Sequence, residues 1–162
     1  MNKLSQRALY FIGFLITVLL LGVIFYLENY NGFVPCPLCI LQRFVLILLG
    51  GICFLGFLLS LKKMGRIVFG FLTSLTALTG VLLSGRQVWL QHLPLDKNAD
   101  CGVSLQYLLN ALPFDQVVMK ILHGTAECSQ RGWELFGLSL AEWSLFCFTG
   151  FMLFGLLQMR RA

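Results

Sequence analysis

Charged residues are scarce in this 162-residue chain, and the scarcity bears first on the class of protein. Charged residues make up 12% of the sequence and hydrophobic residues 58%, a balance that argues against a soluble domain. Residues 8–27 carry no charge across 20 positions, about enough helix to cross a hydrocarbon core of roughly 30 Å. The sequence therefore favours an integral membrane protein.

Three further apolar runs cover residues of about 40–61, 67–85 and 140–158. The run at 40–61 carries one charge, Arg43, and the run at 140–158 carries Glu142, each near an end. A cleavable signal peptide is the alternative for the first run, but that run is long and lacks an Ala-x-Ala-like site. We expect an all-α, four-helix membrane bundle that forms a single domain over residues 1–162.

Acidic residues are absent from three segments: the start of the chain, the stretch between the second and third runs, and the C-terminal end. These segments instead carry Lys3, Arg7, Lys62, Lys63, Arg66, Arg160 and Arg161. Basic segments stay on the cytoplasmic side, so we expect both termini in the cytoplasm. The loops at about 28–39 and 86–139 would then face the periplasm of a Gram-negative cell. The net charge of +5 reflects this topology and indicates no nucleic-acid partner.

Cysteines divide between the expected loops and the spans. Four of the six lie in the outward loops: Cys36, Cys39, Cys101 and Cys128. Disulfides persist in such a compartment. Cys53 and Cys147 lie within spans, where a cysteine is most simply a small apolar packing residue.

The Cys-x-x-Cys pair stands where the first loop meets the second span. Pro37 suits the first turn of a helix, which would place Cys39 in that turn, where the helix dipole favours a thiolate. Arg43 lies one turn further along the same face and needs a partner in an apolar run, such as that thiolate or an electron-rich ligand beside it. A haem attachment motif is excluded, because Ile40 stands where histidine is required.

The long outer loop contains two short amphipathic patterns, one after Ser104 and one after Pro113. We expect short helices that either lie in the membrane interface or form a small cap over the bundle. Cys101 and Cys128 flank these patterns, so a disulfide between them would tie the ends of the loop together. His92, just after the third run, is either a solvated interfacial residue or a functional one.

Two further patterns concern the ends and faces of the spans. Ser139 and Glu142 match a capping box at the start of the last span, which assigns Glu142 to capping and not to chemistry. Small residues also recur in the second and third spans at spacings that let membrane helices pack closely. These are Gly50, Gly51, Gly56, Thr73, Ala77 and Gly80.

Four outward cysteines suit three kinds of chemistry. A dithiol–disulfide relay would exchange electrons with a soluble partner through one pair and pass them to a lipid-soluble acceptor through the other. A four-cysteine zinc site is possible, although Cys101 and Cys128 lie far apart in sequence and zinc leaves Arg43 without a role. Two structural disulfides are the third option, but so short a ring as Cys36–Cys39 removes little chain entropy.

These motifs resemble the DsbB family of inner-membrane thiol–quinone oxidoreductases over essentially the whole chain. The resemblance rests on four spans, the stretch Cys36-Pro37-Leu38-Cys39-Ile40-Leu41-Gln42-Arg43 that enters the second span, the Cys101…Cys128 loop, and Gly137 to Trp143 before the fourth span. It implies an enzyme that reoxidises a DsbA-type, thioredoxin-fold partner and passes the electrons to a membrane quinone, either ubiquinone or menaquinone.

The resemblance also implies residue roles. Cys101 and Cys128 would form the disulfide that oxidises the partner, with Cys101 taking the mixed disulfide. Cys36 would exchange with that pair, and Cys39 would be the thiolate that faces the quinone. Arg43 would stabilise the charge that develops there, and His92 would belong to the quinone site.

Overall fold

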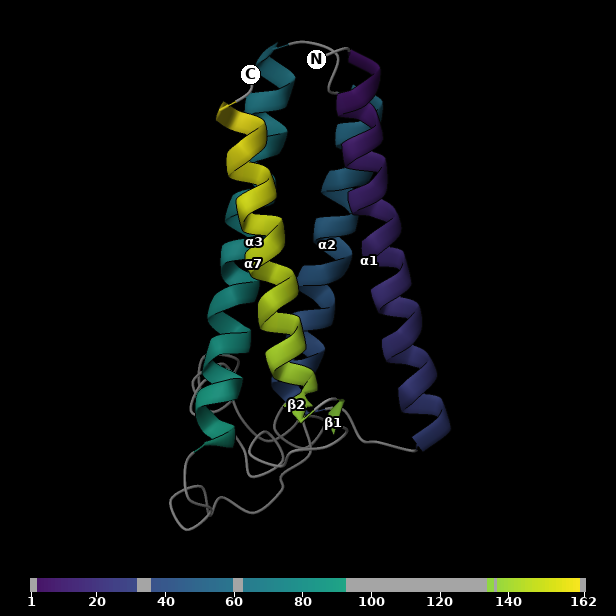
Figure 1. Ribbon diagram of the computed structural model, residues 1–162, viewed down its shortest axis with the longest axis vertical. Helices are drawn as coiled ribbons and strands as arrows, with labels where there is room; N and C mark the ends of the chain where they lie inside the picture. Colours follow the sequence, from purple (N-terminus) through teal and green to yellow (C-terminus); the bar gives the residue numbers. More distant parts are fainter. Residues whose placement is uncertain (1–2, 32–35, 60–62, 93–133, 136, 161–162) are drawn as a thin grey trace, which may run out of the picture.

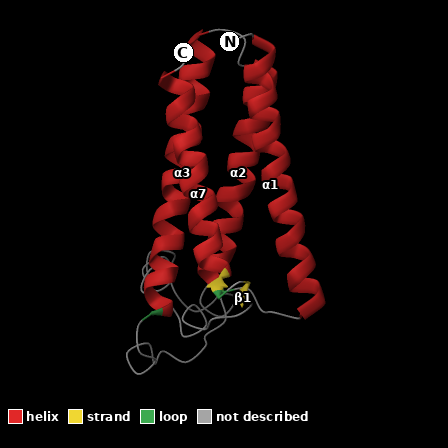
Figure 2. Cartoon of the chain, in the orientation of Figure 1, coloured by secondary structure: helices red, strands yellow, loops and turns green. Residues whose placement is uncertain are grey.

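The computed structural model describes residues 3–31, 36–59, 63–92, 134–135 and 137–160 (Figure 1). Within these residues the chain is helical apart from Cys36, His92 and one short hairpin (Figure 2). The elements are α1 (Lys3–Asn31), α2 (Pro37–Leu59), α3 (Lys63–Gln91), β1 (Glu134–Leu135), β2 (Leu138–Ser139) and α7 (Leu140–Arg160). The expected all-α bundle of four long helices is confirmed; the two-residue strands were not predicted.

All four helices are long and apolar enough to cross a membrane, as expected of a multi-pass membrane protein. The apolar segments are Arg7–Tyr30, Leu38–Leu59, Lys63–Gln91 and Leu140–Arg160. Helix α3 continues to Gln91, so residues 86–91 are helical although the hydropathy pattern assigned them to the outer loop. Hydropathy marks only the apolar part of a helix, whereas backbone hydrogen bonds continue through polar residues at its end.

The helices pack in sequence order: α1 against α2, α2 against α3, and α3 against α7, with the last contact the most extensive. Both termini lie at one end of the bundle and the β1–β2 hairpin lies at the other (Figure 1). The hairpin pairs Glu134 with Ser139 and Leu135 with Leu138, and Gly137 turns it with a φ of 77°. Glycine adopts this left-handed conformation without steric cost.

Glycines allow α3 and α7 to approach each other closely. A Cβ atom on Gly155 would lie 2.6 Å from the carbonyl oxygen of Gly70 and 2.8 Å from the backbone nitrogen of Ser74. A Cβ on Gly80 would overlap the ring of Phe148. Backbone contact of this kind is typical of small residues at membrane helix interfaces.

Glycines also allow close helix approach at the α1–α2 interface. A Cβ on Gly50 would lie 2.8 Å from the hydroxyl oxygen of Thr17, and one on Gly56 would lie 2.8 Å from the ring of Tyr10. The prediction of close packing is therefore confirmed for Gly50 and Gly56, as for Gly80, whereas nothing lies within 4 Å of a Cβ on Gly51.

The buried core forms where α2, α3 and α7 meet, and α1 adds side chains at its edge. Its buried members are Leu46, Leu49, Cys53, Ala77, Phe148 and Phe151. Cys53 is thus a packing residue, as predicted, and both it and the half-buried Cys147 are free thiols. Outward-facing apolar side chains such as Leu19 and Leu82 are about two-thirds exposed, at 65% and 64%, as expected of a surface covered by lipid.

Several sequence predictions lie outside the described residues. They include Cys101, Cys128 and the two amphipathic patterns of the outer loop between them.

The contact at Gly155 generates a stability prediction. We expect Gly155→Ala to lower the stability of the detergent-solubilised protein by about 1–3 kcal/mol, because the added methyl group meets backbone atoms that cannot move aside. Gly150→Ala, in the same helix but with nothing within 4 Å of the added Cβ, is the matched control. It should be neutral or slightly stabilising. Thermal unfolding of both variants checks this, and equal unfolding temperatures would contradict it.

Candidate redox site

Cys36 and Cys39 form a disulfide at the start of α2. The helix begins at Pro37, as the sequence predicted, because a proline ring fits the first turn and its missing N–H needs no partner there. Cys36 immediately precedes the helix in the capping position. Its carbonyl accepts the N–H of Ile40 at 3.1 Å, and its sulfur accepts the N–H of Cys39 at 3.2 Å. A sulfur thus satisfies one of the free N–H groups of the first turn.

The two sulfurs differ in exposure and in partners. Cys36 is buried, with 6% of its surface exposed, whereas Cys39 is half-buried. The side-chain amide nitrogen of Gln87, near the end of α3, lies 3.2 Å from the Cys39 sulfur and 3.6 Å from the Cys36 sulfur. The disulfide is therefore hydrogen-bonded from α3 as well as from its own helix.

Gln87 is the first of three linked polar side chains. Its amide oxygen accepts a hydrogen bond at 2.7 Å from the amide nitrogen of Gln42, on α2. The amide oxygen of Gln42 in turn lies 3.1 Å from the hydroxyl of Ser144, on α7. Gln87 and Gln42 are buried, at 5% and 9% exposure. We call Gln87, Gln42 and Ser144 the amide chain.

Neither Gln87 nor Ser144 was predicted from the sequence to belong to the site. The available signal was the presence of neutral polar side chains inside or at the end of apolar runs, where such groups hydrogen-bond between helices. Spacing within one helix does not tell which of these groups meet. The three hydrogen bonds join residues that are separated in the sequence by 45, 48 and 102 positions.

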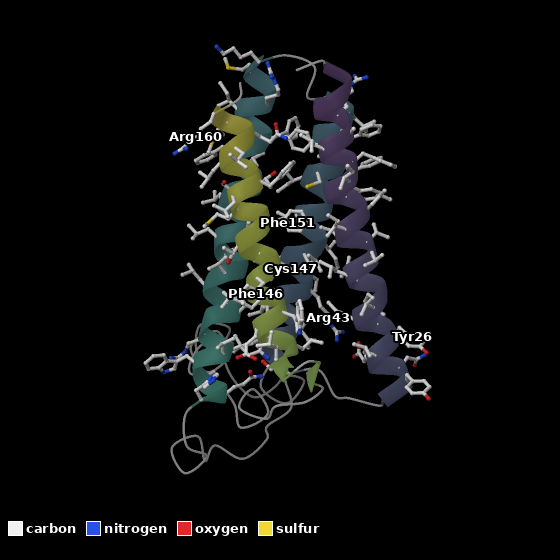
Figure 3. The ribbon with its side chains drawn as sticks, in the orientation of Figure 1. Tyr26, Arg43, Phe146, Cys147, Phe151 and Arg160 are labelled. Carbon is white, nitrogen blue, oxygen red and sulfur yellow. A yellow bond between two sulfur atoms is a disulfide. The ribbon has the colours of Figure 1, made fainter. Side chains whose placement is uncertain are left out.

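Arg43 lies one turn after Cys39 and points toward α1 (Figure 3). Its Nη1 donates to the carboxylate of Glu28 at 2.6 Å, and its guanidinium carbon lies 5.4 Å from the centroid of the Phe25 ring. The side chains of Arg43 and Glu28 are 18% and 27% exposed, so the ion pair is partly shielded from solvent. The partner that the apolar setting of Arg43 demands is thus a carboxylate on α1, which the sequence analysis did not identify. An action of Arg43 on the Cys39 thiolate stays a prediction.

His92 directly follows α3 and is exposed. Its Nδ1 lies 2.9 Å from the carbonyl oxygen of Val88 in the preceding turn. This contact orients the ring at the end of α3. A role for His92 in quinone binding stays a prediction.

A capping box begins α7 and joins it to α3. The N–H of Ser139 donates to Glu142 Oε2 at 2.7 Å, and the N–H of Glu142 donates to the Ser139 hydroxyl at 3.4 Å. The predicted capping role of Glu142 is confirmed. The Ser139 hydroxyl also donates to the amide oxygen of Gln91 at 2.7 Å. This bond ties the end of α3 to the start of α7, close in sequence to Gln87 and Ser144.

Comparison with known proteins supplies the family. The family model described as "Disulfide bond formation protein DsbB" matches residues 6–158. Disulfide bond formation protein B 1 of Pseudomonas aeruginosa is 43% identical over 159 residues, which cover 98% of each chain. Disulfide bond formation protein B of Stutzerimonas stutzeri is 39% identical over 161 residues, 99% of each chain. The protein of that name from Hahella chejuensis is 41% identical over 148 residues, 91% of this chain and 90% of its own.

These matches cover at least 90% of this chain and of each relative. The chain belongs to the DsbB family of disulfide bond formation proteins, with an oxidoreductase role in disulfide formation.

Proposed function

We propose that this protein reoxidises a DsbA-type periplasmic dithiol oxidase and passes the electrons to a membrane quinone. The observation that carries the proposal is the Cys36–Cys39 disulfide at the start of a membrane helix, in a chain of the DsbB family. A disulfide in that position lies between aqueous thiols on one side and the lipid phase on the other.

The relay uses two cysteine pairs in turn. Cys101 and Cys128 oxidise the partner, and Cys101 carries the mixed disulfide. The reduced loop pair then attacks Cys36: a new S–S bond forms at the Cys36 sulfur, the Cys36–Cys39 bond breaks, and its electron pair leaves on Cys39 as a thiolate. Because Cys36 is 6% exposed in this conformation, attack there requires the residues that cover it to move.

The leaving group, Cys39, is placed to carry negative charge. Cys39 lies in the first turn of α2, where the helix dipole favours an anion, and its sulfur already accepts a hydrogen bond from Gln87. A low-pKa leaving thiol departs faster in disulfide exchange.

The residues beside Cys39 fit a quinone. Arg43 offers several N–H donors suited to carbonyl oxygens, and the Phe25 ring stacks against it. Phe44 next to it is 65% exposed on the outer surface of the bundle, so an apolar molecule dissolved in lipid has access to this end of α2. A bound quinone would supply a two-electron acceptor. Arg43 would hold it and stabilise developing negative charge, Glu28 would orient the guanidinium, and His92 is a further candidate for contact.

Basic residues support an inner-membrane orientation with both termini in the cytoplasm. The two termini lie at the same end of the bundle, and the segments at that end carry the acid-free basic clusters (Figure 1). The positive-inside rule then sends the disulfide end into the periplasm.

Two other functions fit the cysteines less well. A zinc site made of all four cysteines needs thiolate ligands, whereas Cys36 and Cys39 are bonded to each other. A purely structural disulfide gains little from closing a ring of four residues.

The proposed orientation places Cys101 and Cys128 on the periplasmic face of the membrane. Thiol reagents that cannot cross membranes should label reduced Cys101 and Cys128 in intact spheroplasts, whose periplasmic face is exposed. Inverted vesicles, which expose the cytoplasmic face, should leave both unlabelled until detergent is added. Labelling of either cysteine from the cytoplasmic face would contradict the proposed topology.

The order of disulfide exchange in the relay can be tested by trapping a covalent intermediate. Cys128→Ser should trap a mixed disulfide between Cys101 and the partner, because the thiol that resolves it is gone. The variant is mixed with oxidised partner: the Cys101 thiolate attacks the partner's disulfide, one partner sulfur bonds to Cys101 and the other leaves as a thiolate. Non-reducing electrophoresis detects the covalent complex, and Cys53→Ser, which removes a core thiol, is the control. A complex that forms through Cys36 and never through Cys101 would overturn the assigned roles.

The proposed role of Arg43 in quinone reduction can be tested by substitution. Arg43→Ala should slow reduction of a soluble quinone analogue by partner-reduced protein about ten- to hundredfold, because a charged donor is lost. Arg43→Lys, which keeps the charge without the planar fork, should be slowed less. Both should retain the Cys101–Cys128 disulfide in a thiol count. Arg160→Ala, at the opposite end of the bundle, should keep the parent rate. A parent rate in Arg43→Ala would remove Arg43 from the mechanism, and no quinone reduction by the parent protein would refute the proposed function.

A further inference from the structure

Three helices contribute to the amide chain, which ends on the redox disulfide. Ser144 comes from α7, Gln42 from α2 and Gln87 from α3, and the two glutamines are buried. Burying a primary amide in an apolar bundle costs free energy unless its groups are paired. Here both ends of each amide have a partner, and the last donor of the chain points at sulfur.

The direction of the chain follows from the chemistry of its end. A disulfide has no hydrogen to donate, so Gln87 must turn its N–H₂ group toward the sulfurs. Its oxygen then faces Gln42, which must present its own N–H₂ group, and the Gln42 oxygen is left to accept from a hydroxyl. Ser144 supplies that hydroxyl; its single proton serves either Gln42 or the carbonyl oxygen of Ala141 at 2.8 Å. Gln42 therefore holds the Gln87 amide in the orientation that donates to sulfur.

Reduction changes what Gln87 contacts. When an attacking thiolate bonds to Cys36, the Cys36–Cys39 bond breaks and its electron pair stays on Cys39. A hydrogen bond to an ionised acceptor is about twice as strong as one to a neutral acceptor. The N–H of Gln87, already 3.2 Å from the Cys39 sulfur, therefore stabilises the reduced form more than the disulfide.

We propose that Gln87 is a catalytic residue that makes the Cys36–Cys39 pair more oxidising. Gln42 is the positioning residue that holds the Gln87 amide in the orientation that donates to sulfur. A pair becomes a stronger oxidant when its reduced form is stabilised. The functional significance of this greater oxidising power rests on the proposed function, in which the Cys36–Cys39 pair must accept electrons from other thiols. In the disulfide state the guanidinium of Arg43 is bonded to Glu28 on α1, whereas Gln87 approaches the disulfide from α3.

The test measures the thiol–disulfide equilibrium of this pair by itself. The full-length chain with Cys101→Ser and Cys128→Ser is equilibrated with reduced and oxidised glutathione, and the reduced fraction is read from the mass added by alkylation. The measured quantity is the squared concentration of reduced glutathione divided by the concentration of oxidised glutathione at which half of the Cys36–Cys39 pair is reduced. We expect Gln87→Leu to raise this ratio about tenfold, which is about 30 mV for a two-electron couple. Gln42→Leu should shift the ratio in the same direction by a smaller factor. In both variants the pH needed for half-maximal alkylation of the reduced pair should rise.

Gln158→Leu is the matched control. Gln158 is also a buried glutamine, at 2% exposure, but it lies near the C-terminal end of α7, away from the disulfide. Its substitution should leave the ratio within about twofold of the parent. The proposal is overturned if Gln87→Leu folds and keeps the parent ratio. If Gln87→Leu does not fold, the same outcome in folded Gln42→Leu overturns it. An equal shift in Gln158→Leu also overturns it. No quinone or protein partner enters the assay, so failure of the proposed function leaves this result interpretable.

Discussion

Polar groups inside a membrane bundle must find their partners within the protein, because the hydrocarbon phase offers none. The end of the bundle that holds the Cys36–Cys39 disulfide obeys this constraint group by group. The N–H of Cys39 bonds to the Cys36 sulfur, the Gln87 amide bonds to both sulfurs, and Gln42 and Ser144 complete the chain. Since these groups come from three helices, the placement of those helices sets the surroundings of the disulfide.

Close packing of α3 against α7 makes that placement possible. At Gly155 the two backbones approach so closely that a Cβ would lie 2.6 Å from the Gly70 oxygen, and Gly80 accommodates the ring of Phe148. At the site end, Ser139, which directly precedes α7, bonds to Gln91 at the end of α3. Packing contacts along the helices and one polar tie at their ends thus keep Gln87 and Ser144 within reach of Gln42.

Charge and neutral polarity are separated around the disulfide. The ion pair of Arg43 and Glu28 joins α2 to α1, with the Phe25 ring beside the guanidinium. The neutral amide chain joins α2 to α3 and α7. An ion pair tolerates partial exposure better than full burial, because burial removes the hydration of both charges. The partly exposed α1 side therefore suits the ion pair, and the buried side suits amides that are fully paired.

Local patterns in the sequence were enough to predict the local features. Long apolar runs predicted the four helices, Pro37 predicted the start of α2, and Ser139 with Glu142 predicted the capping box, because each depends on residues within a few turns of one another. The motif around Cys36 and Cys39, with the loop cysteines, was sufficient to indicate the family. Only the tertiary structure decided that Glu28 pairs with Arg43, that Gln87 meets the disulfide, and that Gly155 lies against Gly70. These contacts join different helices, and their partners depend on how each helix is rotated and how deeply it is set against its neighbours, which the periodicity of a single helix does not specify.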